Sequence, residues 1–494
     1  MNIKTIGILC TISFLLAWGG VCHAAAKLKP LRVVALMDIG ESKDVKLSNG
    51  QTVNLKLISV DEVRDDLRNA VRSAAIKVSV DGKEVVLGAG NYNMPVEVGK
   101  VQIDCPEIKG FFLNSNSRTR TIAKTANLRL WPKGSPFINP GTFVYPLKQA
   151  WFGSLTQSGN EPTYVDWGES ASNKRIYYHS AHDIGGAEGM DEVVAATDGL
   201  VIGVNNKILA GYDTIPVFVH KDAVSVLDDR GWLVEYLHLD STDPQIKLGE
   251  RVKMGQKIGM IGKQGTSGGW VHLHFEIKNK ENLTGTWNTE GAYAYVWEAY
   301  VRQYKPGIIA VARPHHLIWA GQEVTLDGNK SRSMKGEITS YDWTFTDGTK
   351  AKGAIQKKTY NVPGEYSEIL KVTDSKGNVG YDFNIVQVLD KDPAKTIPTI
   401  QPAFHPTLNI KAGDPVTFLV RTFNSEIGNE EWNFGDGTAN VKVKCESINK
   451  SDPTKGKFAE TIHKFSKPGH YVLSVERSNE SGYKATGHLH VVVN

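Results

Sequence analysis

Residues 265–276 read GTSGGWVHLHFE and contain two histidines separated by one leucine. Apolar residues flank the two histidines, which is typical of a β-strand. Side chains two positions apart on a strand share one face, so His272 and His274 project into the same space. Leu273 and Phe275 then point to the opposite face and enter the core. Two imidazoles placed in this way can ligate one metal ion, or divide the work between ligation and proton transfer.

Two further motifs supply the groups that a metal site would still need. His179 and Asp183 lie four residues apart in the stretch YHSAHDIG, residues 178–185, and His238 lies in YLHL, residues 236–239. Two histidines and one carboxylate would form an open zinc site whose fourth position holds a water nucleophile. One neutral imidazole near that water could act as a base, and another could stabilise the developing oxyanion.

A His-x-His pair is weak evidence by itself, because the chain contains a second one. Residues 488–490 read HLH in the predicted last strand, and no His/Asp motif stands near them, so a surface or core strand pair is predicted there. His315 and His316 are predicted to be a solvated pair in a linker. His182 and His220 are interpreted as structural histidines rather than as supports for a metal site.

The surroundings of the first pair resemble those of the lysostaphin/LytM-type zinc metallopeptidases. That family joins His-x-x-x-Asp to a later Tyr-x-His-Leu and then to a His-x-His strand. Residues 249–269 are close to its glycine-rich pattern before that strand. The resemblance covers residues 142–285 and implies an antiparallel-β peptidase domain. Such enzymes are typically endopeptidases that cut peptide bonds in the stems or cross-bridges of bacterial peptidoglycan, often next to glycine.

The resemblance also implies a role for each of the five residues. The resemblance implies that His179, Asp183 and His274 bind one zinc ion. His272 matches the general base. His238 would orient water or stabilise the oxyanion.

The chain departs from the family pattern near the first motif. Ala181 stands where the family often has glycine, and His182 stands where an apolar residue is usual. Neither replaces an implied ligand. Residues 211–237 also form a longer segment than usual, which could reshape a groove wall. The substrate specificity of this chain therefore does not follow from the resemblance.

An internal repeat occupies the C-terminal part of the chain. WTFTDG at residues 343–348 recurs as WNFGDG at 432–437, and PGEY at 363–366 recurs as PGHY at 468–471. The Trp and the Phe two residues later point to one face, and Asp-Gly makes the next turn. Each copy therefore predicts a β-sandwich.

The repeated pattern resembles the PKD family of immunoglobulin-like domains. The resemblance implies adhesion, spacing or docking on polysaccharide or protein, and it does not imply catalysis. A semi-stiff linker is predicted between the two copies from four prolines, Pro393, Pro398, Pro402 and Pro406.

Residues 27–135 form an N-terminal region in which the sequence shows no chemistry. Residues 33–37 predict a strand, and apolar residues at helical spacing predict an amphipathic helix over 61–75. Residues 76–87 predict a hairpin with Asp-Gly in its turn. We expect an α+β region, and its position suggests the hypothesis that it covers the groove as an inhibitory segment.

Composition and targeting signals narrow the classes of function. The chain has 494 residues with 57 Lys and Arg and 53 Asp and Glu, a net charge of +4 that does not suggest a nucleic-acid binder. Lys4, the apolar residues 6–18 and the small residues after them predict a secretory signal peptide. The apolar stretch is shorter than the about 20 residues of a spanning helix, so stable membrane insertion is not expected. Cys105 and Cys445 are predicted to be buried packing residues.

These features together predict a mostly β, multidomain chain. The predicted units are a signal peptide at residues 1–24, an N-terminal α+β domain at 27–135, a peptidase domain at 142–300 and PKD-like sandwiches at 308–390 and 396–494. The predicted function is an exported zinc metalloendopeptidase that acts on peptidoglycan in the periplasm, at the cell envelope or after secretion. Two alternatives stay open: a non-catalytic cell-wall regulator or adhesin, and an extracellular protease of glycine-rich proteins.

Overall fold

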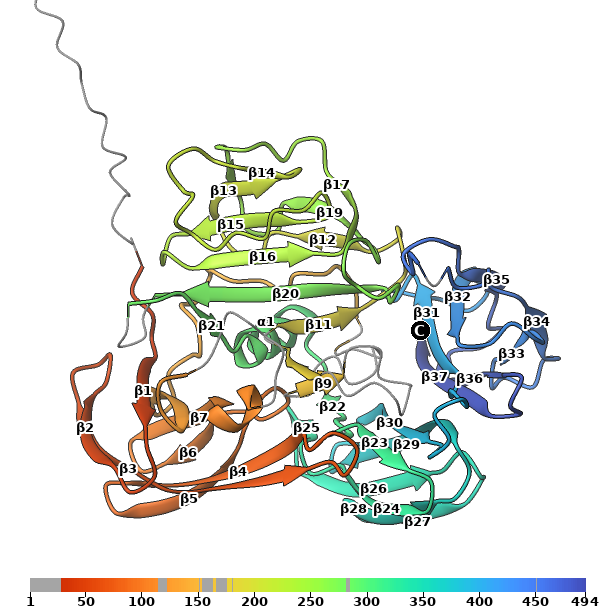
Figure 1. Ribbon diagram of the computed structural model, residues 1–494, viewed down its shortest axis with the longest axis horizontal. Coiled ribbons are helices and arrows are strands. Elements are labelled where there is room, and N and C mark those ends of the chain that lie inside the picture. The colour runs from red at the N-terminus through yellow and green to blue at the C-terminus, as the bar shows by residue number, and fades with distance from the viewer. Residues whose placement is uncertain are drawn as a thin grey trace, which may run out of the picture.

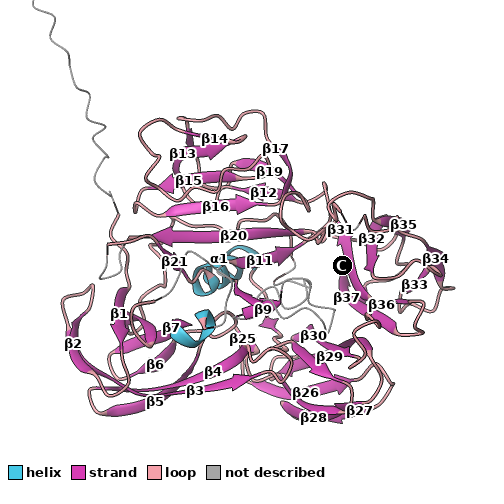
Figure 2. Cartoon of the chain, in the orientation of Figure 1, coloured by secondary structure: helices cyan, strands magenta, loops and turns pink. Residues whose placement is uncertain are grey.

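The computed structural model describes residues 28–113, 122–150, 152, 163–165, 176–179, 181–280, 285–449 and 451–494. These residues are mostly β-strands, as the sequence predicted, with a single α-helix, α1 (Tyr293–Tyr304), and a short 3-10 helix, η1 (Lys109–Phe112), among them (Figure 2). Within these ranges no helix combines the length and apolar character that crossing a membrane requires. The predicted signal peptide lies outside the described residues.

The N-terminal region consists of two antiparallel four-stranded sheets, drawn in red and orange in Figure 1. Their inward side chains, Leu55, Val78 and Leu128 among them, share one buried core. The first sheet has the order β1-β8-β7-β6, with β1 (Val33–Met37), β6 (Val96–Val98), β7 (Val101–Ile108) and β8 (Ala126–Pro132). The second has the order β2-β3-β4-β5, with β2 (Ser42–Lys46), β3 (Thr52–Arg64), β4 (Val71–Val80) and β5 (Lys83–Gly88).

Two of the three elements predicted in this region are confirmed. Strand β1 has the predicted bounds, residues 33–37. Strands β4 and β5 form the predicted hairpin, with Asp81 and Gly82 in its turn at φ angles of 48° and 81°. Two successive positive φ angles are typical of a type I′ turn, whose twist matches that of the flanking strands.

The predicted helix over residues 61–75 is wrong. Strand β3 continues to Arg64, which lies opposite Val71 of β4, and the chain turns between them through Asn69 at a φ of 58°. The apolar spacing spans two strands and a turn, and Val63 is 60% exposed. Pairing along this long hairpin overrides the local pattern. The described part of the N-terminal region is therefore β rather than α+β, apart from η1.

The middle of the chain builds a large sheet against a small one, with a buried apolar core between them. The large sheet follows β11-β20-β16-β15-β13-β14 with β18 and β21 attached, the small sheet follows β12-β19-β17, and β9 pairs with β10. Their bounds are β9 (Thr163–Val165), β10 (Ile176–Tyr178), β11 (His182–Gly185), β12 (Glu192–Val194), β13 (Gly199–Val204), β14 (Lys207–Ile208), β15 (Val224–Asp228), β16 (Leu233–Leu237), β17 (Leu239–Thr242), β18 (Arg251–Val252), β19 (Lys257–Ile261), β20 (His272–Asn279) and β21 (Asn288–Glu290).

The two repeats are β-sandwiches, as predicted, and Trp343 and Trp432 are buried in their cores. Parallel pairing of β29 with β37 joins one sheet of each repeat into a continuous sheet. The first repeat contains β22 (Ile308–Ile309), β23 (His316–Trp319), β24 (Gln322–Asp327), β25 (Arg332–Ser333), β26 (Ile338–Thr344), β27 (Lys350–Lys352), β28 (Ile355–Tyr360), β29 (Gly364–Asp374) and β30 (Val379–Leu389). The second contains β31 (Thr399–His405), β32 (Val416–Phe423), β33 (Glu430–Asn433), β34 (Val441–Val443), β35 (Ala459–His463), β36 (Gly469–Ser478) and β37 (Lys484–Val493).

Two predictions about the repeats need correction. His315 is not solvated: it is 3% exposed, and its Nδ1 accepts a hydrogen bond from the N–H of Ile385 at 3.0 Å. His316 begins β23, which pairs with β30. Pro402 lies inside β31 rather than in a linker, at the edge of a sheet, where a missing N–H is tolerated.

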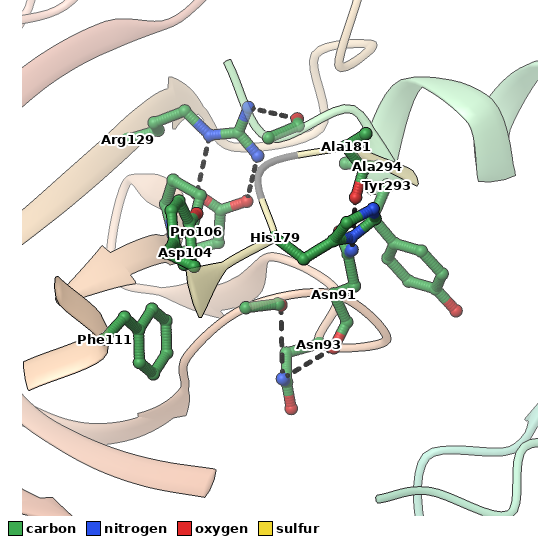
Figure 3. Close-up of a pocket in the computed structure, with 13 residues that line it drawn as sticks. Asn91, Asn93, Asp104, Pro106, Phe111, Arg129, His179, Ala181, Tyr293 and Ala294 are labelled. Carbon is green, nitrogen blue, oxygen red and sulfur yellow. Dashed lines mark hydrogen bonds and ion pairs between the residues drawn. The ribbon is translucent and has the colours of Figure 1, made fainter. Parts of the chain in front are cut away.

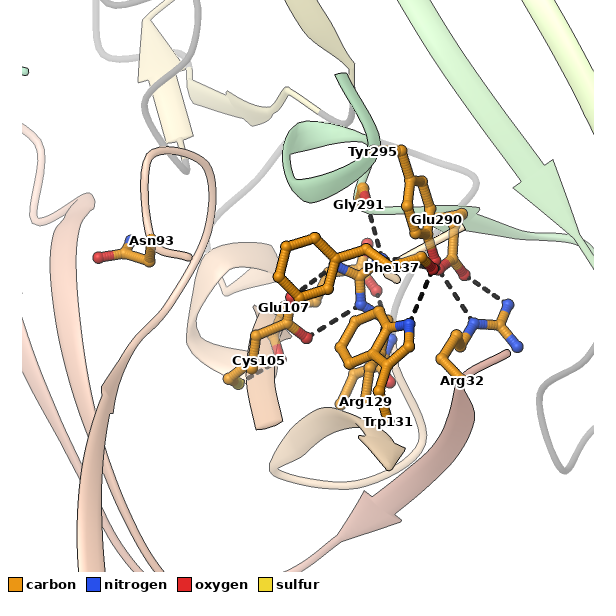
Figure 4. Close-up of polar contacts among 12 residues, drawn as sticks. Arg32, Asn93, Cys105, Glu107, Arg129, Trp131, Phe137, Glu290, Gly291 and Tyr295 are labelled. Carbon is orange, nitrogen blue, oxygen red and sulfur yellow. Dashed lines mark hydrogen bonds and ion pairs between the residues drawn. The ribbon is translucent and has the colours of Figure 1, made fainter. Parts of the chain in front are cut away.

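A buried ion-pair network joins the N-terminal region to the large sheet (Figure 4). Arg129 of β8 lies 2.6 Å from both Asp104 and Glu290, and Arg32 lies 2.7 Å from Glu290. The Tyr295 hydroxyl also donates to Glu290 at 2.6 Å. Burial would raise the pKa of Glu290, but the two guanidinium groups hold it well below its ordinary value. Because β21 pairs with β20, this network fixes the N-terminal region against the strand of the His-x-His pair.

We predict that Glu290→Gln lowers the free energy of unfolding by about 3–5 kcal/mol, because it leaves two buried guanidinium groups without their shared carboxylate. Denaturant unfolding beside Glu323→Gln checks this, since Glu323 pairs with Lys357 at the exposed surface and its loss should cost less than about 0.5 kcal/mol.

The stability difference between wild type and Glu290→Gln should depend on pH. A lowered folded-state pKa stabilises the fold above the unfolded-state pKa of Glu290, and this contribution is lost as the pH falls toward the folded-state value. The difference in the free energy of unfolding between wild type and Glu290→Gln should therefore become smaller at acid pH. Equal free energies of unfolding for wild type and Glu290→Gln at neutral pH would contradict the role of the network.

Candidate metal centre and active site

Strands β11 and β20 bring the two halves of the predicted site together. They are antiparallel neighbours, with Asp183 opposite His274 and Gly185 opposite His272. Directly opposed residues of such a pair extend to the same face of the sheet. The Asp183 carboxylate and the His274 imidazole therefore meet, and His179, which follows β10, reaches the same point.

Three potential ligand atoms form a nearly equilateral triangle. Nε2 of His179 lies 3.3 Å from Oδ1 of Asp183 and 3.2 Å from Nδ1 of His274. The same Nδ1 lies 3.2 Å from Oδ1 of Asp183. Tetrahedral zinc with bonds of about 2.0–2.1 Å keeps its ligand atoms about 3.3 Å apart. The triangle therefore fits three corners of a tetrahedral metal site without rearrangement of the side chains.

Two more histidines stand beside this triangle. His238, His272 and His274 form a second group whose ligand atoms all lie within 4.8 Å of one another. The ring centroid of His238 lies 4.8 Å from that of His272 and 5.6 Å from that of His274. Because His274 belongs to both groups, the five predicted residues form one continuous cluster.

Backbone carbonyls fix the tautomers of these two histidines. Nδ1 of His272 lies 3.1 Å from the carbonyl oxygen of Trp270, and Nδ1 of His238 lies 2.8 Å from that of Gln264. A carbonyl oxygen only accepts, so each Nδ1 carries the hydrogen and donates it. The neutral imidazole then keeps its lone pair at Nε2, where it can accept a proton.

Burial and the contacts within the cluster shift the pKa values of its residues in opposite directions. It lowers the pKa of His272 to about 3, against the opposing charge of Asp183, and it also lowers the pKa of His274. Burial would raise the pKa of Asp183, but His179 and His272 hold it well below its ordinary value. Neutral imidazoles and an ionised carboxylate are the forms in which these side chains bind a divalent cation.

Asp222 lies beside this cluster and was not predicted from the sequence. Its carboxylate accepts a hydrogen bond from the backbone N–H of His238 at 3.2 Å and lies 3.5 Å from Nδ1 of the same residue. Asp222 can therefore hold His238 in place and balance a positive charge on it. No motif marks Asp222, which precedes β15 and meets His238 only through the fold. The neighbouring His220 is largely exposed and belongs to neither ligand group.

His182 and the two histidines of the second His-x-His pair lie outside these ligand groups. His182 is 1% exposed, and its ring packs against Tyr92 and Tyr293 at centroid distances of 6.1 and 5.6 Å. Among the described residues, neither His488 nor His490 takes part in a group that could hold a metal ion.

The N-terminal region borders the cluster on the side of His179 (Figure 3). The Asn91 amide donates a hydrogen bond to the carbonyl of Ala181 at 3.2 Å. The Tyr178 hydroxyl donates one to Glu107 at 3.0 Å. The chain segment around His179 is thus held by the N-terminal region, and an inhibitory role of that region stays a prediction.

Models of known protein families match three parts of the chain. The model described as peptidase family M23 matches residues 177–285. Two models described as PKD domains match residues 306–388 and 403–493.

Curated relatives cover parts of the chain. Lipoprotein NlpD of Yersinia enterocolitica is 36% identical over 98 residues, which are 20% of this chain and 87% of that protein. Murein hydrolase activator NlpD of Salmonella dublin is also 36% identical over 98 residues, 20% of this chain but 22% of the activator. A microbial collagenase of Vibrio alginolyticus is 25% identical over 194 residues, 35% of this chain and 24% of the collagenase. The chain thus spans about a quarter or less of the last two relatives.

One similar solved structure, from Ruminococcus gnavus, is named as a glycyl-glycine endopeptidase, lytM. It is 22% identical, covers 32% of this chain and 60% of its own, and superposes with a TM-score of 0.21. The family matches and the NlpD relatives identify the family of the chain. The chain belongs to peptidase family M23, and its LytM-type domain is accompanied by two PKD domains.

Proposed function

We propose that the chain is an exported zinc-dependent endopeptidase that hydrolyses peptide bonds in the stems or cross-bridges of peptidoglycan. The observation that carries this proposal is the triangle of ligand atoms from His179, Asp183 and His274. Two histidines and a carboxylate at tetrahedral spacing suit zinc and leave a position for water. Membership of peptidase family M23 and the murein-related names of the NlpD relatives support a cell-wall substrate.

A zinc ion bound by these three residues would polarise the scissile carbonyl and lower the pKa of a water molecule. His272 then serves as the general base: its Nε2 accepts a proton from the attacking water while Nδ1–H stays bonded to Trp270. His238 orients that water through Nε2 while neutral. Alternatively, an imidazolium at His238 that has taken its proton from solvent before the substrate binds would donate its Nε2–H to the oxyanion, and the nearby Asp222 carboxylate would balance its charge.

A non-catalytic regulator is the second candidate, because relatives of this chain are named murein hydrolase activators. The ligand triangle and the two imidazoles beside it favour an enzyme, since activation alone requires neither. The collagenase relative keeps a third candidate open, an extracellular protease of glycine-rich proteins.

We predict that the purified mature protein loaded with zinc releases peptide fragments from isolated peptidoglycan or from oligoglycine peptides. A metal chelator should abolish the release, and added zinc should restore it. Chromatography and mass spectrometry of the products identify the bond, and elastin-like protein as a parallel substrate tests the third candidate. Intact substrates in every reaction, with faster cleavage by an added murein hydrolase, would instead support the regulator.

The two histidines of β20 should have separable roles. We predict that His274→Ala loses the metal, whereas His272→Ala keeps it and loses turnover by about 10²–10⁴-fold, the range for removal of a general base. Metal content by mass spectrometry and peptide release measure the two effects. His490→Ala, in the HLH strand of the second PKD domain, is the matched control and should change neither. Equal loss of zinc in both β20 variants would mean that the roles are wrongly assigned.

A further inference from the structure

The second PKD domain forms hydrogen bonds with the backbone immediately before β20. The Gln401 side chain, on β31, accepts a hydrogen bond from the N–H of Val271 at 2.8 Å and donates one to the carbonyl of the same residue at 2.7 Å. A neighbouring strand makes the same pair of bonds in an antiparallel ladder. Gln401 and Val271 are both buried. Figure 1 shows the start of β20 beside β31.

The two residues before Val271 also contact the second PKD domain. The Trp270 indole stacks on Phe423 of β32, with ring centroids 4.3 Å apart and planes 8° from parallel. Arg421, also on β32 and fully buried, donates to the carbonyl of Gly269 at 3.1 Å. A Cβ on Gly269 would lie 2.3 Å from the carbonyl oxygen of Pro453, so the two backbones approach too closely for a side chain there.

The contact between the two domains is part of the folded core. Ala403, Leu419 and Phe458 of the second PKD domain belong to the same buried apolar cluster as the core of the peptidase domain. Nδ1 of His405 lies 2.8 Å from a carboxylate oxygen of Asp191 at the rim of this contact. A spacer or a mobile docking module would need no such continuity, because its partner lies elsewhere.

The backbone of Trp270 and Val271 orients His272. The Trp270 carbonyl accepts the Nδ1–H of His272, and the next peptide leads directly into the backbone of that histidine. Displacement of Trp270 and Val271 would therefore tilt the imidazole and release its tautomer. A shift of about 1 Å in a catalytic group can cost about 10²-fold in rate.

We propose that the second PKD domain is a positioning element of the active site. Gln401 and Phe423 fix the backbone of Trp270 and Val271, and through it the orientation and tautomer of His272. The proposal rests on the function proposed above, in which His272 is the general base. It makes Gln401 and Phe423 positioning residues, since neither touches the metal ligands or the reacting atoms.

The test uses the full-length mature chain with substitutions on the PKD side of the contact. Gln401→Leu keeps the volume and removes both hydrogen bonds, Phe423→Ala removes the stacked ring, and Phe423→Trp keeps a ring in place. Ile462→Ala is the control, because Ile462 is 65% exposed and lies on β35, in the three-stranded sheet β31-β32-β35 that also carries Gln401 and Phe423. Zinc content and thermal unfolding establish that each variant is folded and loaded.

We expect kcat to fall by about 10–100-fold in Gln401→Leu and Phe423→Ala, with the smaller part of the change in KM and with full zinc content. Phe423→Trp and Ile462→Ala should stay near wild type. Wild-type kcat in folded, zinc-loaded Gln401→Leu and Phe423→Ala would overturn the proposal, and so would an equal loss in Phe423→Trp.

A second measurement separates this proposal from the proposed function. Imidazole ¹⁵N spectra of histidine-labelled protein report the tautomer of His272 whether or not the protein turns over substrate. The wild type should show a single Nδ1–H tautomer at His272, and Gln401→Leu should show a mixture. An inactive wild type with this spectral change would refute the endopeptidase and keep the positioning role, whereas an unchanged spectrum would refute the positioning role itself.

Discussion

The antiparallel register around β20 is the constraint on which the whole site depends. Strand β11 on one side places Asp183 opposite His274, and β16 on the other side ends with Leu237 opposite His274, so that His238 follows at the same level. Leu273 and Phe275 are fully buried on the other face and hold this register. A slip of one residue would turn both imidazoles of β20 into the core and both apolar side chains into the site.

The N-terminal region and the second PKD domain both contact residues next to β20. The N-terminal region reaches it through the ion pairs of Glu290 on β21, and the second PKD domain reaches it through Gln401. The peptidase domain is therefore one part of a larger folded unit. Burial within this unit lowers the pKa of His272 and His274 and keeps their imidazoles neutral, as ligands and bases must be.

The sequence predicted the parts of the molecule that local patterns encode. The His-x-His strand, the repeated Trp cores and the Asp-Gly hairpin depend on neighbours in sequence, and all three are present. Asp222 and Gln401 could not be predicted, because they reach the site only through contacts made by the fold. The helix over residues 61–75 failed for the same reason: long-range strand pairing overrode a local apolar spacing.

The most direct test of the metal centre is anomalous diffraction at the zinc edge from crystals of the zinc-loaded protein. We predict one strong peak within about 2.0–2.2 Å of His179 Nε2, Asp183 Oδ1 and His274 Nδ1, with no peak at the HLH strand of residues 488–490. A peak bound by other residues, or no peak in crystals with stoichiometric zinc, would contradict the account.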